Sequence, residues 1–323
     1  MMPFNLYTSD LQPLKDTFGE RLQEDVSLAR HTAARLGGPA EAFLEVHSAN
    51  ELAEAAKLLW QWDIPYTILG GGSNVLVSDA GVRGVVLLNR ARSVRFEEQA
   101  GSPSVWAESG ANFGLIARQA AQRGLSGLEW AAGIPGTLGG AVVGNAGAHG
   151  GDMAGNLELA EILHLDKEAG QEQPRRDAWP LESLGLEYRS SIFKRRPGKA
   201  VVLSAVLKLK HSSPQAVQAR LDEYVAYRRR TQPPGASMGS MFKNPPGDYA
   251  GRLIEAAGMK GIRIGNAQIS SLHANFFINQ GEANAADVFS LIQMARQAVA
   301  NKFGVKLELE IELVGEWSVD REA

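Results

Sequence analysis

The chain has 323 residues, of which 44% are hydrophobic and 21% charged, so it can bury a large core and should divide into two or three domains. Its 33 basic and 36 acidic side chains give a net charge of -3, which provides no long-range field to attract nucleic acid or an anionic membrane. The absence of cysteine excludes disulfides and thiolate metal sites and favours a reducing, cytoplasmic location, and no stretch approaches the ~18 apolar residues of a membrane span.

The first ~30 residues are polar and aperiodic, so we expect a leading arm. Asn50 is placed to cap a helix that ends before Pro65. The apolar face of that helix is expected to consist of Leu52, Ala55, Ala56, Leu59 and Trp62. Strands are predicted at residues 66–69, 75–77 and 85–88.

Three consecutive glycines, Gly70, Gly71 and Gly72, join the first two of these strands and are followed by Ser73 and Asn74. In a P-loop or a Rossmann fingerprint the glycines open a helix, so this strand-to-strand setting excludes both. Glycines allow positive φ and let backbone N–H groups approach a pyrophosphate, and the serine and asparagine add side-chain donors. Taken alone, however, the motif is more typical of a flexible hairpin turn.

A helix is predicted from Asn112 to Arg123 and should stop at Gly124. The following stretch, residues 128–151, is too rich in glycine for any long element. It contains a second glycine run, residues 132–140, which continues through residues 144–148 as GNAGA. Two such loops in one domain are hard to explain as turns, so together they favour a ligand cradle. Further strands are expected at residues 157–165 and 201–209.

The last third is expected to form a separate domain after a boundary at residues 211–214. Pro214 suits the first position of a helix that runs to about Arg229. Apolar positions between residues 288 and 303 mark another helix, which Gly304 ends. A last strand is predicted at residues 305–314. Its polar positions, normally a solvated face, are Lys306, Glu308, Glu310 and Glu312.

Several polar residues have an ordinary interpretation when each is taken alone. Arg189 beside Tyr188 is typical of a solvated surface pair. Ser240 has no neighbouring acid or histidine in sequence, which gives a serine hydrolase no support and favours a turn serine. His31 is expected to be structural. The basic run at residues 228–230 either complements the dipole of the preceding helix or contacts a substrate pyrophosphate.

Long segments in order nevertheless resemble the UDP-N-acetylenolpyruvoylglucosamine reductase family, and the similarity covers nearly everything from residue 30 to 315. The segments are RLGG at 35–38, GGGSN at 70–74, AGIPGTLGGAVVGNAGA at 132–148, YRSSIFK at 188–194, GSMFKNP at 239–245, the stretch 258–271, HANF at 273–276 and LELE at 307–310. The segment SLHANF at 271–276 resembles the family's subtype with the shorter substrate-covering insertion.

The resemblance implies an α+β fold: a two-subdomain FAD-binding module of the vanillyl-alcohol-oxidase type and a C-terminal mixed α+β substrate-binding domain. The implied boundaries are an arm at 1–35, FAD-binding subdomains at 36–88 and 89–212, and a substrate-binding domain at 213–323. FAD is expected to be non-covalent, in a monomeric protein without a metal. The residues expected to bind it are Gly70, Gly71, Gly72, Ser73, Asn74, Gly133, Ile134, Pro135, Gly136, Gly140 and Ala146.

The resemblance also assigns catalytic roles. Arg189 would hold the carboxylate of UDP-N-acetylglucosamine enolpyruvate, Ser240 would protonate the substrate, and Glu310 would be the catalytic glutamate. Tyr188, Lys243 and Asn244 are expected to bind substrate, and NADPH to reduce the flavin. Leu309 departs from the family's usual proline or polar residue without touching the acid. Two alternatives stay open: a flavin oxidase of the same fold acting on an alcohol or sugar acid, and a non-catalytic nucleotide-sugar binding protein.

Overall fold

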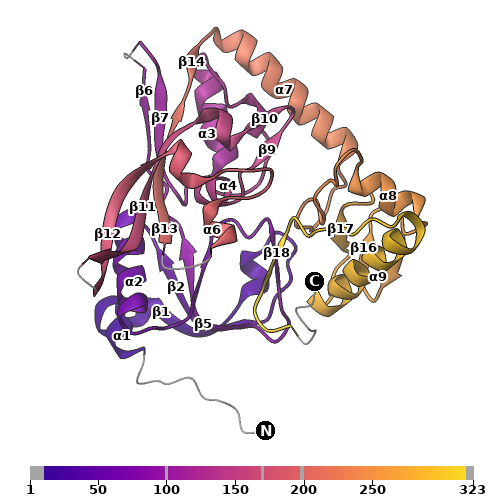
Figure 1. Cartoon of the computed structure of the whole chain (residues 1–323), viewed down its shortest axis with the longest axis horizontal. Helices are drawn as coiled ribbons and strands as arrows, with labels where there is room; N and C mark the ends of the chain where they lie inside the picture. Colours follow the sequence, from indigo (N-terminus) through magenta and orange to yellow (C-terminus); the bar gives the residue numbers. More distant parts are fainter. Residues whose placement is uncertain (1–10, 99–100, 169–170, 197–199, 318–323) are drawn as a thin grey trace, which may run out of the picture. The chain divides into compact units, whose positions relative to one another are not determined.

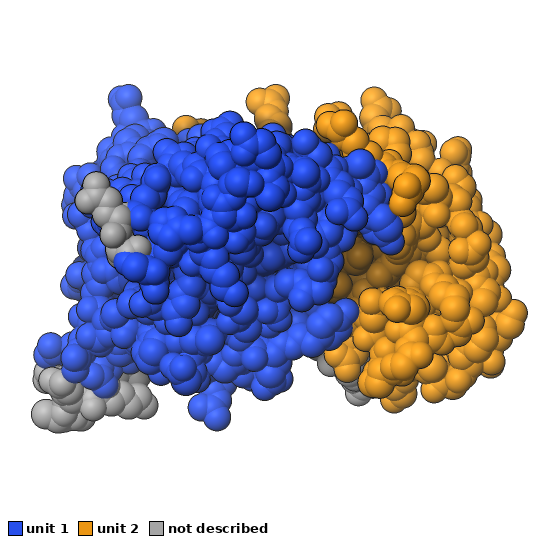
Figure 2. Space-filling model, turned by 90° about the horizontal axis from the view of Figure 1, so that it is seen from above, with its two compact units in different colours: residues 1–22, 44–71, 87–228 blue, residues 23–43, 72–86, 229–323 orange. Residues whose placement is uncertain are grey.

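A computed structural model describes residues 11–98, 101–168, 171–196 and 200–317 of the chain. The chain forms two compact units, each assembled from separate stretches of sequence and coloured separately in Figure 2. Unit 1 comprises residues 1–22, 44–71 and 87–228, and unit 2 comprises residues 23–43, 72–86 and 229–323. The division into an arm and three consecutive domains that the sequence implied stays a prediction.

Unit 1 is built on a five-stranded antiparallel sheet (Figure 1). In order across the sheet its strands are β12 (Gln171–Pro180), β11 (Leu157–Glu168), β13 (Ala200–Lys208), β7 (Ser104–Glu108) and β6 (Val94–Glu97). The strands expected at residues 157–165 and 201–209 are therefore confirmed. The sequence did not predict β12, because its polar residues show no apolar alternation; it is an edge strand held by the ladder to β11 and by ion pairs such as Arg176–Glu161.

Two helices contribute to the apolar core next to this sheet. Helix α3 (Phe113–Gln122) begins after Asn112, whose side chain accepts the N–H of Leu115 at 2.9 Å, and Gly124 follows its end with φ of 69°. This confirms the predicted helix and its stop signal. Helix α4 (Leu138–Val143) lies inside the second glycine run. The shorter elements of the unit are β8 (Leu125–Ser126), β9 (Gly147–Ala148), β10 (Gly151–Asp152), α5 (Met153–Asn156), α6 (Ile192–Arg195) and β14 (Lys210–His211).

Helix α2 (Ala49–Gln61) corrects two details of the predicted helix. Its cap is Ser48, whose hydroxyl accepts the N–H of Glu51 at 3.1 Å, whereas Asn50 lies inside the helix and accepts a hydrogen bond from Arg176 at 2.6 Å. Trp62, expected on the buried face, follows the last turn and is 54% exposed, and Trp60 is buried instead. The helix ends one residue too early to carry Trp62 inward.

The expected arm is only partly irregular. Helix α1 (Gln12–Phe18) and strand β1 (Leu22–Ser27) form within it because Leu14, Phe18 and Leu22 are buried, an apolar spacing hidden among polar residues. Residues 1–10 lie outside the described part of the chain. Strand β1 belongs to a four-stranded sheet whose order is β1, β2 (Pro39–Val46), β5 (Val82–Asn89) and β3 (Tyr66–Leu69).

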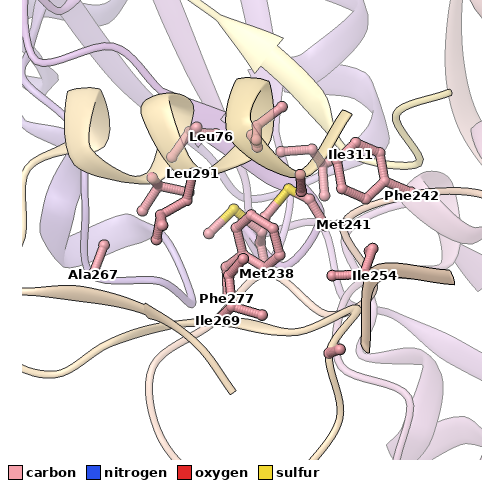
Figure 3. Close-up of a cluster of buried hydrophobic side chains, with 14 of the residues drawn as sticks. Leu76, Met238, Met241, Phe242, Ile254, Ala267, Ile269, Phe277, Leu291 and Ile311 are labelled. Carbon is pink, nitrogen blue, oxygen red and sulfur yellow. The ribbon is translucent and has the colours of Figure 1, made fainter. Parts of the chain in front are cut away.

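Unit 2 packs two helices against small sheets, as Figure 1 shows for α8 and α9 beside β16 and β17. Figure 3 shows the apolar centre of this unit, where Met241, Phe242 and Phe277 are fully buried. Pro214 begins helix α7 (Pro214–Thr231), which runs from unit 1 into unit 2. The α-helices and strands that lie wholly within unit 2 are β4 (Val75–Val77), α8 (Ala250–Ala256), β15 (Arg263–Ile264), β16 (Ala267–Ile269), β17 (Phe277–Asn279), α9 (Ala285–Phe303) and β18 (Glu312–Val314).

The predicted last strand is wrong over most of its length. Only Glu312–Val314 form a strand, paired in parallel with β4, while residues 305–311 form no ladder beyond an isolated bridge at Leu309 and bend at 310–311. The alternation that motivated the prediction is real, since Leu307 and Ile311 are buried. The backbone of Glu308, Glu310 and Glu312, however, bonds to two different segments in turn, to residues 241–243 and then to Asn74, so this stretch has no single partner strand.

Candidate active site

The two glycine runs meet inside unit 1. An ideal Cβ on Gly71 would lie 2.9 Å from the Cα of Gly136, and one on Gly70 would collide with the hydroxyl of Thr137. A side chain at either position would push the loops apart, so glycine is required for their close approach. The structure thus brings together the two loops that the sequence had paired only by their composition, and these paired loops, residues 70–71 and 136–137, are the candidate cradle.

Much of the second glycine run is held by hydrogen bonds within the fold. Gly136 accepts the N–H of Phe113 at 3.1 Å, and Thr137 accepts the N–H of Gly140 at 3.4 Å as the cap of α4. Ala146 donates its N–H to Ala141 at 2.9 Å. The N–H groups of Gly140 and Ala146 therefore already have partners. A bound cofactor would contact these two residues by van der Waals packing and not through their N–H groups. The positions themselves stay predicted contacts.

Arg189 is fixed against this second run by the loop that carries it. Its Nη2 donates to the carbonyl of Gly147 at 2.8 Å. Two bonds on either side reinforce the docking: Asn145 donates to the Glu187 carbonyl at 2.8 Å, and Ser191 donates to the Val143 carbonyl at 2.6 Å. The guanidinium is therefore held in one place beside the cradle, unlike the solvated surface arginine that the local sequence favoured.

The surroundings of Arg189 are positively charged and aromatic. Burial and then the charge of Arg189 lower the pKa of Arg228, which lies in α7. Two guanidiniums close enough to interact in this way are stabilised by an anion between them. Tyr188 is 56% exposed, and its ring centre lies 5.6 Å from the Cζ of Arg189. The arrangement suits a ligand that carries a carboxylate or phosphate.

Within unit 2, the end of the first glycine turn is tied to the segment that carries Glu310. The side-chain nitrogen of Asn74 donates to the Glu310 carbonyl at 3.0 Å, and the Asn74 carbonyl accepts the N–H of Glu312 at 2.9 Å. Gly72 has a φ of 58°, and its carbonyl accepts the N–H of Ala33 at 2.9 Å. The side-chain nitrogen of Asn74, predicted to face a cofactor, therefore holds the Glu310 segment.

Ser240 and Glu310 are brought to neighbouring segments of unit 2. Phe242 and Leu309 form an antiparallel bridge, and the N–H of Glu310 donates to the carbonyl of Met241 at 2.9 Å. Glu310 is half-buried, whereas the other polar members of its row are exposed: Lys306, Glu308 and Glu312. The acid that the family resemblance selected is the one withdrawn from solvent, which a uniform solvated face does not explain.

Lys243 and Asn244 have structural partners near the same segment. The Nζ of Lys243 lies 3.3 Å from the Oε2 of Glu308, whose side chain is 76% exposed. Asn244 accepts the N–H of Ala250 at 3.1 Å, which anchors the start of α8. Asn275, which belongs to the HANF segment but was not among the predicted site residues, holds Phe242 through two side-chain hydrogen bonds. Its position in that motif was the only available signal.

The described residues add two further findings. Across residues 11–98, 101–168, 171–196 and 200–317, no group of three histidine or acidic side chains is placed to hold a metal ion. Within the same part of the chain, every helix is too short or too polar to cross a membrane.

Comparison with known proteins gives consistent matches. An FAD binding domain model matches residues 40–163, and the model of the UDP-N-acetylenolpyruvoylglucosamine reductase C-terminal domain matches residues 231–314. UDP-N-acetylenolpyruvoylglucosamine reductases of Chloroflexus aggregans and Rubrobacter xylanophilus are 42% and 44% identical to the chain; the matches cover 93% and 90% of this chain and 100% and 95% of the relatives.

A solved structure extends these matches to the fold. UDP-N-acetylenolpyruvylglucosamine reductase from Thermus caldophilus is 37% identical, with a TM-score of 0.74, and the match covers 91% of this chain and 99% of that one. The expected α+β fold, with an FAD-binding module followed by a C-terminal domain, is thereby confirmed.

Proposed function

Because the chain belongs to the UDP-N-acetylenolpyruvoylglucosamine reductase family, we propose that it reduces the enolpyruvyl group of UDP-N-acetylglucosamine enolpyruvate to the lactyl ether of UDP-N-acetylmuramate, a step of peptidoglycan synthesis. The observation that carries this proposal is the bond between Glu310 and Met241, which sets the predicted acid beside the segment of the predicted proton donor, Ser240.

The chain has an FAD-binding domain, and its paired glycine loops fit that cofactor. The loops at residues 70–74 and 133–136, with Gly140 and Ala146, would hold FAD without a covalent bond. When bound, FAD would supply the hydride-transfer chemistry, for which we propose NADPH as the reductant. Gly70 and Gly71 let the first loop lie against residues 136–137, where a Cβ would intrude.

The residues of the chain would supply position, charge and a proton. The fixed guanidinium of Arg189 would bind the substrate carboxylate and stabilise the negative charge that develops on it during the reaction. The positive charge of Arg228 would add to this stabilisation. A hydride added to the terminal carbon, and a proton from the Ser240 hydroxyl added to the carbon beside the carboxylate, together saturate the double bond. Glu310 would orient the reacting group.

The rest of the substrate would be bound by polar side chains. Tyr188 is exposed beside Arg189, and Lys243 and Asn244 follow Ser240 in sequence. We assign these three to UDP-sugar binding and residues 213–323 to the substrate-binding domain. Lys243 would then exchange its exposed partner Glu308 for a substrate oxygen.

The proton-donor role is tested by separating the two half-reactions in Ser240→Ala. Reduction of the flavin by NADPH should be unchanged, because the hydroxyl takes no part in it. Reoxidation by the enolpyruvyl substrate should slow by about 10²-fold or more, since general acid catalysis contributes that much. Stopped-flow absorbance of the flavin measures both rates, and equal slowing of the two would exclude the role.

Arg189→Lys tests the carboxylate assignment in the same instrument. A lysine keeps the charge but cannot reproduce the two-pronged geometry of the guanidinium. We expect reoxidation by substrate to slow while reduction by NADPH stays near the parent rate. Unchanged reoxidation would refute the assignment of Arg189.

A further inference from the structure

Asn275 is a polar residue in the apolar core of unit 2, and it is 3% exposed. Its Oδ1 accepts the N–H of Phe242 at 2.9 Å, and its Nδ2 donates to the carbonyl of the same residue at 2.8 Å. The side chain therefore pairs with both polar groups of one residue, as a neighbouring strand would do.

The backbone of Asn275 adds two more bonds. Its carbonyl accepts the N–H of Met241 at 2.7 Å, and its own N–H donates to the Nδ1 of His273 at 3.2 Å. Burial lowers the pKa of His273, which favours the neutral ring whose Nδ1 accepts this bond. A fully paired amide in an apolar environment holds its partners strongly, because an unmade bond there is expensive.

The two residues that Asn275 holds lie between the predicted catalytic side chains. Ser240 directly precedes Met241 and forms a bridge with Phe276, the neighbour of Asn275. Glu310 is attached from the other side, through its N–H to the Met241 carbonyl. Met241 and Phe242 are themselves fully buried, as Figure 3 shows. The placement of both functional groups therefore depends on the Met241–Phe242 backbone.

We propose that Asn275 is a positioning residue for the reduction: its side-chain amide fixes the Met241–Phe242 backbone so that Ser240 and Glu310 meet the substrate in one geometry. Asn275 is buried beneath the segment and does not itself touch the substrate. The proposal rests on the proposed function, because it requires Ser240 and Glu310 to act on the enolpyruvyl group.

Asn275→Asp in the full-length, FAD-loaded protein is the sharpest test. The substitution keeps the size and the acceptor of the side chain, but it removes the donor and sets an oxygen against the Phe242 carbonyl. The flavin is reduced photochemically without air and then mixed with UDP-N-acetylglucosamine enolpyruvate, so the result does not depend on NADPH. Reoxidation should slow by about 10- to 100-fold, the effect of a misplacement of about 1 Å. Reoxidation by dioxygen should stay within about twofold.

Asn279→Asp is the matched control. Asn279 is the last residue of β17, in the same unit, and its amide makes the same kinds of bond, to the Ala34 carbonyl at 3.0 Å and from the N–H groups of Gly281 and Ala283 at 2.9 and 3.1 Å. This variant should lower the melting temperature without slowing reoxidation by substrate. Hydrogen exchange gives a readout apart from activity: the amides of Met241 and Phe242 should exchange faster in Asn275→Asp and not in the control.

Three outcomes decide the proposal. Selective slowing in Asn275→Asp, with faster exchange at residues 241–242, supports it. Equal slowing in both variants, or an unchanged substrate rate despite faster exchange, overturns it. Ser240→Ala and Glu310→Gln are measured alongside; if neither slows reoxidation, the proposed function has failed, and the role of Asn275 with it. Should Asn275→Asp not fold, the uncharged variant Asn275→Ser, which removes both side-chain bonds to Phe242, undergoes the same measurements and is judged by the same outcomes.

Discussion

Arg189 adopts a backbone conformation that is unfavourable for any residue with a Cβ, with φ of 55°. Left-handed φ in an arginine costs on the order of 1 kcal/mol, and such residues cluster where function requires a fixed geometry. Here the turn is closed by two hydrogen bonds between Glu187 and Ser190, and the guanidinium is bonded to Gly147. The strain is therefore retained by bonds that also aim the side chain.

This strain predicts a difference between two variants that both lack the guanidinium. Arg189→Gly should be more stable than Arg189→Ala by about 1 kcal/mol, because only alanine keeps a Cβ at positive φ. Both should lose reoxidation by substrate to a similar degree. Thermal and urea unfolding compare the stabilities, and stopped-flow absorbance compares the rates. An alanine variant as stable as the glycine variant would show that the backbone at residue 189 relaxes freely.

At the scale of elements, helix α7 is fastened to the second glycine run by a histidine. The His149 ring stacks on Tyr224 with centroids 4.2 Å apart and 6° between the planes, and it meets Tyr227 edge-on at 5.5 Å. Within the described part of the chain, the Nε2 of His149 is buried without a hydrogen-bond partner. Burial, and then the charge of Arg228, lower the pKa of His149, against a smaller opposing effect of Glu223.

The sign of this shift fixes a pH dependence. Because the pKa of His149 is lower in the folded protein than its ordinary value of 6.5, the unfolded chain binds more protons below that pH. Stability should therefore fall as the pH drops from 6.5 toward the folded-state pKa. His149→Tyr keeps an aromatic ring at the same backbone position and should make the melting temperature less dependent on pH in this range. The exposed His211, changed to Gln, is the control, and a dependence unaltered in His149→Tyr would contradict the assignment.

The helices also show which of their ends the local sequence predicts. Helices α3, α7 and α9 were predictable because Asn112, Pro214 and Gly304 mark their ends within a few residues of a clear apolar period. The cap of α2 was not, since Ser48 and Asn50 are both good caps, and the choice is made by Arg176, far away in sequence, which binds Asn50. Long-range partners decide such cases.

The candidate site, too, was predictable from the sequence only in part. Family resemblance named Ser240 and Glu310 from short motifs, and both stay predictions. No local pattern, however, could show that their segments are joined, because the bond between Met241 and Glu310 links residues far apart in the chain. The role that we propose for Asn275 could not be predicted for the same reason. It rests on hydrogen bonds to Phe242, and these form only when the core of unit 2 assembles.

At the scale of the whole molecule, each compact unit has its own apolar core, and the turn at residues 70–74 belongs partly to each. The chain passes from unit 1 to unit 2 between Gly71 and Gly72. Gly71 allows the close approach to Gly136. Gly72 has a positive φ, and a Cβ there would collide with the backbone of His31 and Thr32. Consecutive glycines are thus required for different reasons, which is why the triple glycine is more than a flexible hairpin.

Gly71→Ala tests whether the meeting of the two loops holds the flavin. Its φ is compatible with alanine, so the change acts only through the contact at 2.9 Å between the new Cβ and the Gly136 Cα, which must open by several tenths of an ångström. We expect the dissociation constant of FAD to rise at least about tenfold, or about 1.4 kcal/mol. Gly155→Ala, whose Cβ would make an ordinary 3.5 Å contact with Asp152, should bind FAD like the parent. Titration of the apoprotein by flavin fluorescence measures both. Parent-like affinity in Gly71→Ala would mean that FAD is held elsewhere, because separating the two loops must weaken the binding of a cofactor that both of them contact.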